Sequence, residues 1–187
     1  MENDPLFFVF LQPLKRFRFL VCILYERRKG SVRTADEITA IYERHADTVW
    51  RVCFAFMKNH DEAQDLLQET FVRLIRSETA FDSPEHEKAW LIVTASNLCK
   101  NALKSPARRT EDIDDHEELP APETAADYDV AEAILKLPPE YKDVIYLYYY
   151  AGYRSAEIAK LQDKPPATVR TQLARARKLL KKFLEEP

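Results

Sequence analysis

The sequence predicts an all-α protein of two small helical domains joined by an acidic flexible linker, the C-terminal domain being a helix-turn-helix. Only two glycines stand against eleven prolines, which disfavours strand-and-turn architectures and glycine-rich phosphate loops. Apolar residues recur at three- and four-residue spacing, the pattern of helices that bury one face. Residues 110–130 hold nine carboxylates, two prolines and no lysine or arginine, so they cannot bury a core and separate two folded parts.

Charge also divides the chain. The formal net charge of −3 is made of +4 in residues 1–35, −2 in 36–109, −9 in 110–130 and +4 in 131–187. We take these four segments as an N-terminal extension that is poorly ordered, a first helical domain, the acidic linker and the helix-turn-helix domain. Basic and acidic blocks in one chain are typical of a protein that contacts both nucleic acid and a basic protein surface.

The N-terminal extension is apolar and aromatic from Leu6 to Tyr25. Pro13 and the cations of Lys15–Arg18 interrupt this run short of the roughly 20 apolar residues that a membrane helix needs. Charges in its middle and the lack of a small-residue cleavage site argue against a signal peptide. We therefore predict no membrane span and a cytoplasmic location. A basic helix at a membrane surface stays open as an alternative to an ill-packed extension, which we favour.

Three half-buried helices are predicted in the first domain. Asp61 and Gln64 have capping-box spacing at the start of the second helix. Trp90 falls in the apolar stripe of the third and is read as a core residue. The predicted helices are Asp36–Met57, Asp61–Arg76 and Glu85–Lys104.

Four helices are predicted after the linker. Gly152 stops the second of them, and Pro166 suits the first position of the last because its missing amide hydrogen would be unpaired there. The predicted ranges are Val130–Leu137, Glu140–Ala151, Ser155–Leu161 and Pro166–Leu184. A short helix, a tight turn and a longer helix form the arrangement that enters a DNA major groove.

The last helix has one apolar and one cationic face. Its stripe is Val169, Leu173, Ala176, Leu180 and Phe183, and no acidic residue occurs from Pro166 to Leu184. A charge run is usually only a solvated helix face, but the preceding turn and the absence of acid favour DNA. We expect Arg170, Thr171 and Arg175 to reach base edges and later cations to meet phosphates.

Cysteines and histidines argue against a metal site. Cys22, Cys53 and Cys99 are odd in number and far apart, and the four histidines are scattered, so no metal-ligand spacing occurs. Reduced, buried thiols are expected. Without a glycine-rich cradle or a nucleophile triad, the sequence predicts a protein that is not an enzyme and has no cofactor and no small-molecule substrate.

Two separated groups of motifs carry a family resemblance. The first group is Asp61–Leu74, Ala89-Trp90-Leu91 and Asn97-Leu98, and the second is Leu137–Tyr141, Glu157-Ile158-Ala159, Thr168–Thr171 and Ala174–Arg177. Together they resemble the extracytoplasmic-function (group IV) sigma factors of bacterial RNA polymerase, over roughly residues 36 to 184. The departures are Arg154 in place of a serine or threonine cap, Pro166-Ala167 in place of an apolar-Gly pair, and a small Ala174.

The resemblance implies roles for named residues. A clamp of core RNA polymerase would bind the second helix through Asp61, Asp65, Gln68 and Glu69. The melted minus-10 strand would be held by Asn97, Lys100, Asn101, Arg108 and Arg109. The minus-35 element would be read or anchored by Thr168, Arg170, Thr171, Ala174, Arg175, Arg177, Lys178 and Lys181. The acidic linker would thread toward the RNA path of the polymerase, or serve as a plain tether.

The function implied is that of an alternative sigma factor, which binds core RNA polymerase and directs promoter-specific initiation. The alternative is a self-sufficient helix-turn-helix regulator that does not require polymerase. An ordinary repressor of that kind needs a symmetric dimer, and no dimerisation helix is evident in the sequence. Promoter DNA is the second partner. An anti-sigma factor is a third that the family allows and the sequence does not identify.

Overall fold

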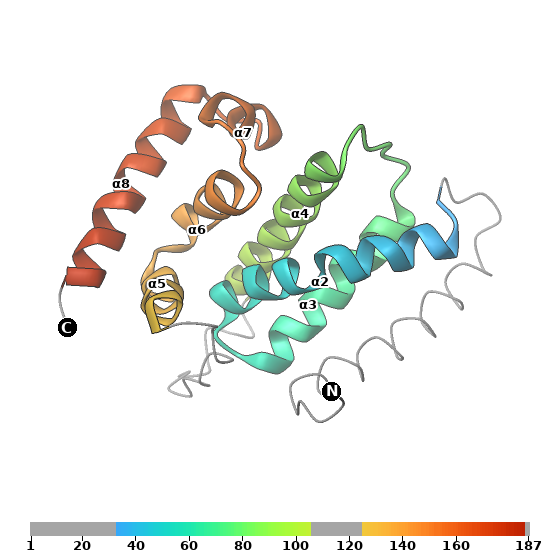
Figure 1. The fold of residues 1–187 in the computed structure, drawn as a ribbon, viewed down its shortest axis with the longest axis horizontal. Helices are drawn as coiled ribbons and strands as arrows, with labels where there is room; N and C mark the ends of the chain where they lie inside the picture. The colour runs from blue at the N-terminus through green and yellow to red at the C-terminus, as the bar shows by residue number, and fades with distance from the viewer. Residues whose placement is uncertain (1–32, 106–124, 186–187) are drawn as a thin grey trace.

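The computed structural model describes residues 33–105 and 125–185, and every regular element in these two stretches is helical (Figure 1). In chain order these are α2 (Ala35–Met57), α3 (His60–Arg76), α4 (Pro84–Lys104), α5 (Ala125–Lys136), α6 (Pro139–Ile145), the π-helical turn η2 (Tyr146–Tyr150), α7 (Ser155–Leu161) and α8 (Pro166–Glu185). The all-α prediction is confirmed. The predicted extension up to residue 32, the linker up to residue 124, and Cys22, Arg108 and Arg109 lie outside the described residues. Within the described ranges, no helix is long and apolar enough to cross a membrane.

Helices α2, α3 and α4 pack together as the first helical group (Figure 1). The ring of Tyr42 on α2 lies 4.8 Å from that of Phe71 on α3, and Phe71 is fully buried. Trp90 is partly buried on α4, where it packs against Phe81 at 5.8 Å. Each helix presents one apolar face to the others, as the spacing in the sequence predicts.

The start of α3 corrects the predicted capping box. Lys58 ends α2 in the left-handed region at φ 56°, which leaves Asn59 extended and free to cap the next helix. Asn59 Oδ1 accepts a hydrogen bond from the Glu62 amide at 3.0 Å. Asp61 already lies inside the helix, and its side chain is fully exposed. The prediction that Asp61 and Gln64 form the cap is therefore wrong.

Helix α5 begins at Ala125, five residues before the predicted start at Val130. Ala125 and Ala126 have the highest helix propensity of any residue type. The end of the stretch that we assigned to the linker is therefore helical.

The predicted helix over Glu140–Ala151 divides in two. The α-helical pattern ends at Ile145 and continues as the π-helical turn η2, closed by a hydrogen bond from the Ala151 amide to the Tyr146 carbonyl at 3.1 Å. The helical backbone ends before Gly152, which has φ +75°, as predicted. The wider turn buries Tyr146 and Leu147 and leaves Tyr149 and Tyr150 exposed at the surface.

The helix-turn-helix follows the predicted ranges. Helix α7 begins at Ser155, where the Glu157 carboxylate accepts a hydrogen bond from the Arg154 amide at 2.7 Å. Asp163, at φ 50°, turns the chain, and α8 begins at Pro166. Helices α6 and α7 both pack against α8. These contacts set the angle at which α8 leaves the turn.

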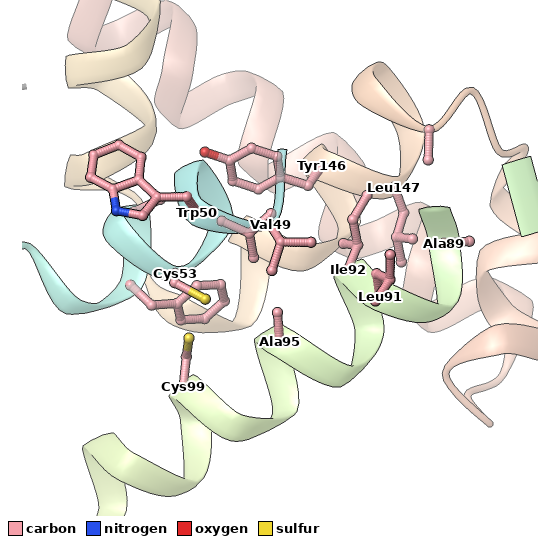
Figure 2. Packing of buried hydrophobic residues seen from close by; sticks show 14 of the residues in the cluster. Val49, Trp50, Cys53, Ala89, Leu91, Ile92, Ala95, Cys99, Tyr146 and Leu147 are labelled. Carbon is pink, nitrogen blue, oxygen red and sulfur yellow. The ribbon is translucent and has the colours of Figure 1, made fainter. Parts of the chain in front are cut away.

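The first helical group is joined, by a contact that was not predicted from the sequence, to the C-terminal helical group, which consists of α5, α6, η2, α7 and α8. Their apolar side chains form one continuous cluster, in which Tyr146 and Leu147 of η2 lie with Val49 of α2 and Ile92 of α4 (Figure 2). Helix α6 packs against both α2 and α4. Among the described residues, the apolar cores of the two helical groups are therefore continuous.

Candidate nucleic-acid and polymerase interfaces

Helix α8 presents the predicted DNA-binding face outward. Its stripe residues Val169, Leu173 and Ala176 are buried, and Leu180 and Phe183 pack partly buried against the same core. All eight residues predicted for the minus-35 element are exposed: Thr168, Arg170, Thr171, Ala174, Arg175, Arg177, Lys178 and Lys181. A rigid helix with one packed and one cationic face can lie along the phosphates of a groove.

Arg177 differs from the other cations of α8. Its Nε donates a hydrogen bond to the Tyr149 hydroxyl at 3.0 Å, and its guanidinium lies 4.8 Å from the centre of the Tyr148 ring. The hydrogen bond with Tyr149 raises the pKa of Arg177. These contacts brace α8 against η2, so this side chain has a structural task within the domain.

The acidic face of α3 lies opposite its buried face. Ala63, Leu67 and Phe71 point into the core, whereas Asp61 and Asp65 are exposed and Gln68 and Glu69 are partly exposed. Glu69 forms an exposed ion pair with Arg73 at 3.2 Å. Such a pair is screened by water and contributes little to stability, so it leaves the carboxylate able to exchange partners.

The end of α4 brings two of the predicted minus-10 residues to the surface and draws a third away. Asn97 and Asn101 are exposed and lie one helical turn apart. Lys100, which follows Asn97 by three residues, forms an ion pair with Asp143 of α6, and its side chain is 23% exposed. The structure thus places Lys100 beneath the C-terminal helical group rather than on an open surface.

Asp143 is the centre of a buried polar cluster. Besides Lys100, its carboxylate accepts a hydrogen bond from Gln162 Nε2 at 2.9 Å and lies 3.9 Å from Lys164 Nζ. Its other oxygen accepts from the Val144 amide at 3.0 Å. One carboxylate therefore ties α4 to α6 and to the turn between α7 and α8.

Lys142 is a second buried charge that the sequence analysis did not identify. It is 2% exposed, and its Nζ donates to the carbonyls of Ala55 on α2 and Leu135 on α5. Burial, and secondarily the nearby charge of Lys58, lowers its pKa to about 7. A signal was present in the sequence, since Lys142 stands one helical turn before the apolar residue Ile145 and so faces inward.

A hollow of about 310 Å³ lies between the start of α2 and the loop that joins α3 to α4. Glu87 forms part of its wall and is buried. The Glu87 carboxylate is neutralised by Arg44 at 2.9 Å and hydrogen-bonds to His45 Nε2 at 2.8 Å. Desolvation lowers the pKa of His45. The contacts with Arg44 and His45 are sufficient to stabilise the buried Glu87 carboxylate, so no bound ligand is needed to explain its burial.

Two family models match the chain, in the order in which the helical groups occur. Residues 41–110 match Sigma-70 region 2, and residues 128–180 match Sigma-70 region 4. The first range covers the helices that carry the acidic face of α3 and the asparagines of α4. The second covers η2 and the helix-turn-helix.

Several curated relatives align over most of their own length. The RNA polymerase sigma factor SigV of Bacillus subtilis is 30% identical over 165 residues, which are 82% of this chain and 94% of the relative. The ECF RNA polymerase sigma factor SigW of the same organism is 28% identical and covers 85% and 93%. SigL of Mycobacterium tuberculosis is 29% identical and covers 79% and 88%.

A solved structure has a similar fold. The sigma factor RpoE of Bartonella quintana, in complex with the anti-sigma factor NepR, matches with a TM-score of 0.62 and 21% sequence identity. The match covers 78% of this chain and 94% of that one.

Proposed function

The chain belongs to the extracytoplasmic-function sigma factors, which direct transcription with RNA polymerase, and we propose how its surfaces divide that work. Helix α3 would bind core polymerase, the end of α4 would hold the melted minus-10 strand, and α8 would contact the minus-35 element. The main support for this assignment of roles comes from α8. Its apolar stripe is buried, and all eight residues predicted to contact DNA are exposed on its cationic face.

Carboxylates on α3 are proposed to meet basic side chains of the polymerase clamp. Charge-assisted hydrogen bonds from arginine to carboxylate are among the stronger polar contacts in proteins. Replacing Asp65 or Glu69 by arginine reverses the charge at an exposed position without touching the core. We expect Asp65→Arg and Glu69→Arg each to reduce retention by core polymerase at least about 10-fold in a pull-down.

Glu43 supplies the matched control for that pull-down. It is an exposed carboxylate on α2, so Glu43→Arg makes the same change of charge on a different helix and is expected to retain polymerase. Undiminished retention of both α3 variants would remove the proposed clamp contact.

The end of α4 is proposed to take up the unpaired minus-10 strand. Amides such as those of Asn97 and Asn101 can read the edge of an unpaired base, and cations hold its phosphates. Lys100, Arg108 and Arg109 would supply those cations. Run-off transcription with core polymerase and a library of promoters tests the whole proposal, since promoter-dependent transcripts identify both the class and the sequence preference.

We further propose that the protein acts in the cytoplasm, where polymerase and promoter meet, and that it has no catalytic chemistry, cofactor or small-molecule substrate of its own. An anti-sigma factor is a proposed partner by analogy with the Bartonella quintana complex. The alternative of a self-sufficient regulator is not favoured, because one chain carries both sigma-70 regions in order.

A further inference from the structure

Two cysteines face each other in the core of the first helical group. Cys53 of α2 and Cys99 of α4 lie opposite one another, and their sulfur atoms point toward each other (Figure 2). Both are free thiols and both are 0% exposed. Val49 and Ala95, one turn earlier on the same two helices, belong to the same apolar cluster. The packing of α2 on α4 therefore holds the two thiols together.

The two thiols are joined by a hydrogen bond, which together with burial raises the pKa of Cys53. A disulfide bond is about 2.05 Å long and links side chains whose Cβ atoms are about 3.8 Å apart. Sulfur atoms that already share a hydrogen need to approach by only about 1.5 to 2 Å to form such a bond. The pair thus has the orientation of a disulfide while both thiols are still reduced.

Two further groups beside Cys99 suit the chemistry of oxidation. The Lys142 side chain interacts electrostatically with Cys99, so a thiolate formed there would face a cation as well as apolar neighbours. Ser96 precedes Cys99 by one helical turn and is 1% exposed, and its hydroxyl has no hydrogen-bond partner among the described residues. Residues three apart on a helix are neighbours, so an oxygen atom added to Cys99 would offer this hydroxyl an acceptor.

We propose that Cys53 and Cys99 form a redox modification site, at which a hydroperoxide joins α2 to α4 through a reversible disulfide. Cys99 lies between the exposed asparagines Asn97 and Asn101 in the sequence. The bond would therefore link oxidation to the turn of α4 that carries them. The inference goes beyond the proposed function and does not depend on it, because it concerns two core residues and no DNA contact.

The proposed reaction balances with hydrogen peroxide as the oxidant. The Cys99 thiolate attacks one peroxide oxygen, the O–O bond breaks, and the departing hydroxide takes up the thiol proton to leave as water. The Cys53 sulfur then attacks the resulting sulfenic acid. The S–O bond breaks as the S–S bond forms, and the hydroxyl leaves as a second water with the Cys53 proton. Two thiols lose two electrons, and the peroxide gains them.

Burial determines which reagents can reach the pair. Hydrogen peroxide is only slightly larger than water and can enter during brief local openings, whereas glutathione is too large to fit between the packed helices. The sulfenic acid forms beside its partner thiol, which captures it before a second peroxide arrives. Burial thus favours a disulfide over further oxidation of either sulfur.

The test is treatment of the full-length Cys22→Ser protein with hydrogen peroxide, followed by mass spectrometry. This variant leaves Cys53 and Cys99 as its cysteines. We expect a digest prepared without reductant to contain the two cysteine peptides crosslinked, with a mass lower by two hydrogen atoms, and dithiothreitol to restore both thiols. Because the bond closes a long loop, the oxidised protein is expected to melt at least about 5 °C above the reduced protein.

Two alanine variants provide the matched controls. Cys53→Ala and Cys99→Ala, each in the Cys22→Ser background, keep a small apolar side chain and leave a single thiol. Neither is expected to form the crosslink or to melt higher after peroxide treatment. The proposal is overturned if both thiols of the Cys22→Ser protein stay reduced, or if each is oxidised separately to a sulfinic acid; the pair then only fills the core. An equal rise in melting temperature in the alanine variants overturns it too.

Discussion

Lys142 and Asp143 are adjacent residues of opposite charge, and both are buried where α6 meets the first helical group. Each charge has partners of its own. Lys142 donates to backbone carbonyls, whereas Asp143 pairs with Lys100 and Gln162. A buried charge is tolerated when it is paired or hydrogen-bonded, so the two residues link the helical groups without forming a pair with each other.

The lowered pKa of Lys142 predicts a dependence of stability on pH. The folded protein holds this group at a pKa of about 7, against 10.5 for an ordinary lysine. Between these values the unfolded chain binds more protons, so the free energy of unfolding rises with pH, by at most about 1.4 kcal/mol per unit. Below pH 7 both states are protonated and the burial cost is fully present.

Urea denaturation at pH 7, 8 and 9 measures this slope. Lys142→Met removes the titrating group and keeps an unbranched apolar side chain, so the slope of that variant is expected to be smaller. Lys58 faces the same region as a like charge, and Cys99 lies near enough to affect the pKa of Lys142. Equal slopes in the two proteins would contradict the assignment.

At the scale of the element, the caps determine where the helices begin. Asn59 caps α3, and the Thr34–Glu37 capping box starts α2, with the Thr34 amide donating to the Glu37 carboxylate at 2.6 Å. These residues satisfy amide groups that have no partner within the helix. Whether Asn59 or Asp61 caps α3 depends on the residue at which α2 ends. That end is at Lys58, whose backbone lies in the left-handed region, a conformation that the sequence does not indicate.

The cap of α3 can be tested by a pair of alanine substitutions. Asn59→Ala removes the acceptor of the Glu62 amide and is expected to cost about 1 kcal/mol. Asp61→Ala removes a favourable charge near the helix start and an exposed contact with His60 at 3.6 Å, and it is expected to cost only about 0.3 kcal/mol. Denaturant unfolding of both variants checks the order, and the reverse order would restore the cap that the sequence suggested.

Helix α8 is expected to show two kinds of DNA contact. If Arg170 or Arg175 forms a bidentate contact to a base, its replacement by alanine costs about 1 to 3 kcal/mol and relaxes specificity at that position. Lys181→Ala should weaken every sequence alike and reduce the salt slope by about 1. Holoenzyme binding to a promoter series at several salt concentrations separates the two, and equal losses on every promoter would refute the division.

At the scale of the whole molecule, one core spans both helical groups. Tyr146 and Leu147 of the C-terminal group are buried in the cluster that includes Val49 and Ile92. A shared core couples the unfolding of its parts. We expect a single calorimetric transition in the free protein and a broadened or double transition in Asp143→Asn, because that variant loses a buried contact between the groups.

Helical spacing and the scarcity of glycine were sufficient to predict an all-α chain, and the acidic stretch to predict the linker, because they are local properties of neighbouring residues. The same is true of the cationic face of α8, which follows from a period of 3.6 residues. The π-helical turn at Tyr146–Tyr150 and the start of α5 could not be placed as precisely, since helix ends respond to what packs against them.

The sequence by itself therefore determined the helices, their apolar faces and the positions of the candidate interface residues along the chain. The tertiary structure alone decided that Lys100 meets Asp143, that Lys142 donates to the carbonyls of Ala55 and Leu135, and that Arg177 braces α8 against Tyr149. The physical reason is separation along the chain: Lys100 and Asp143 are 43 residues apart. A periodic pattern shows which face of a helix is buried, but not which helix covers it.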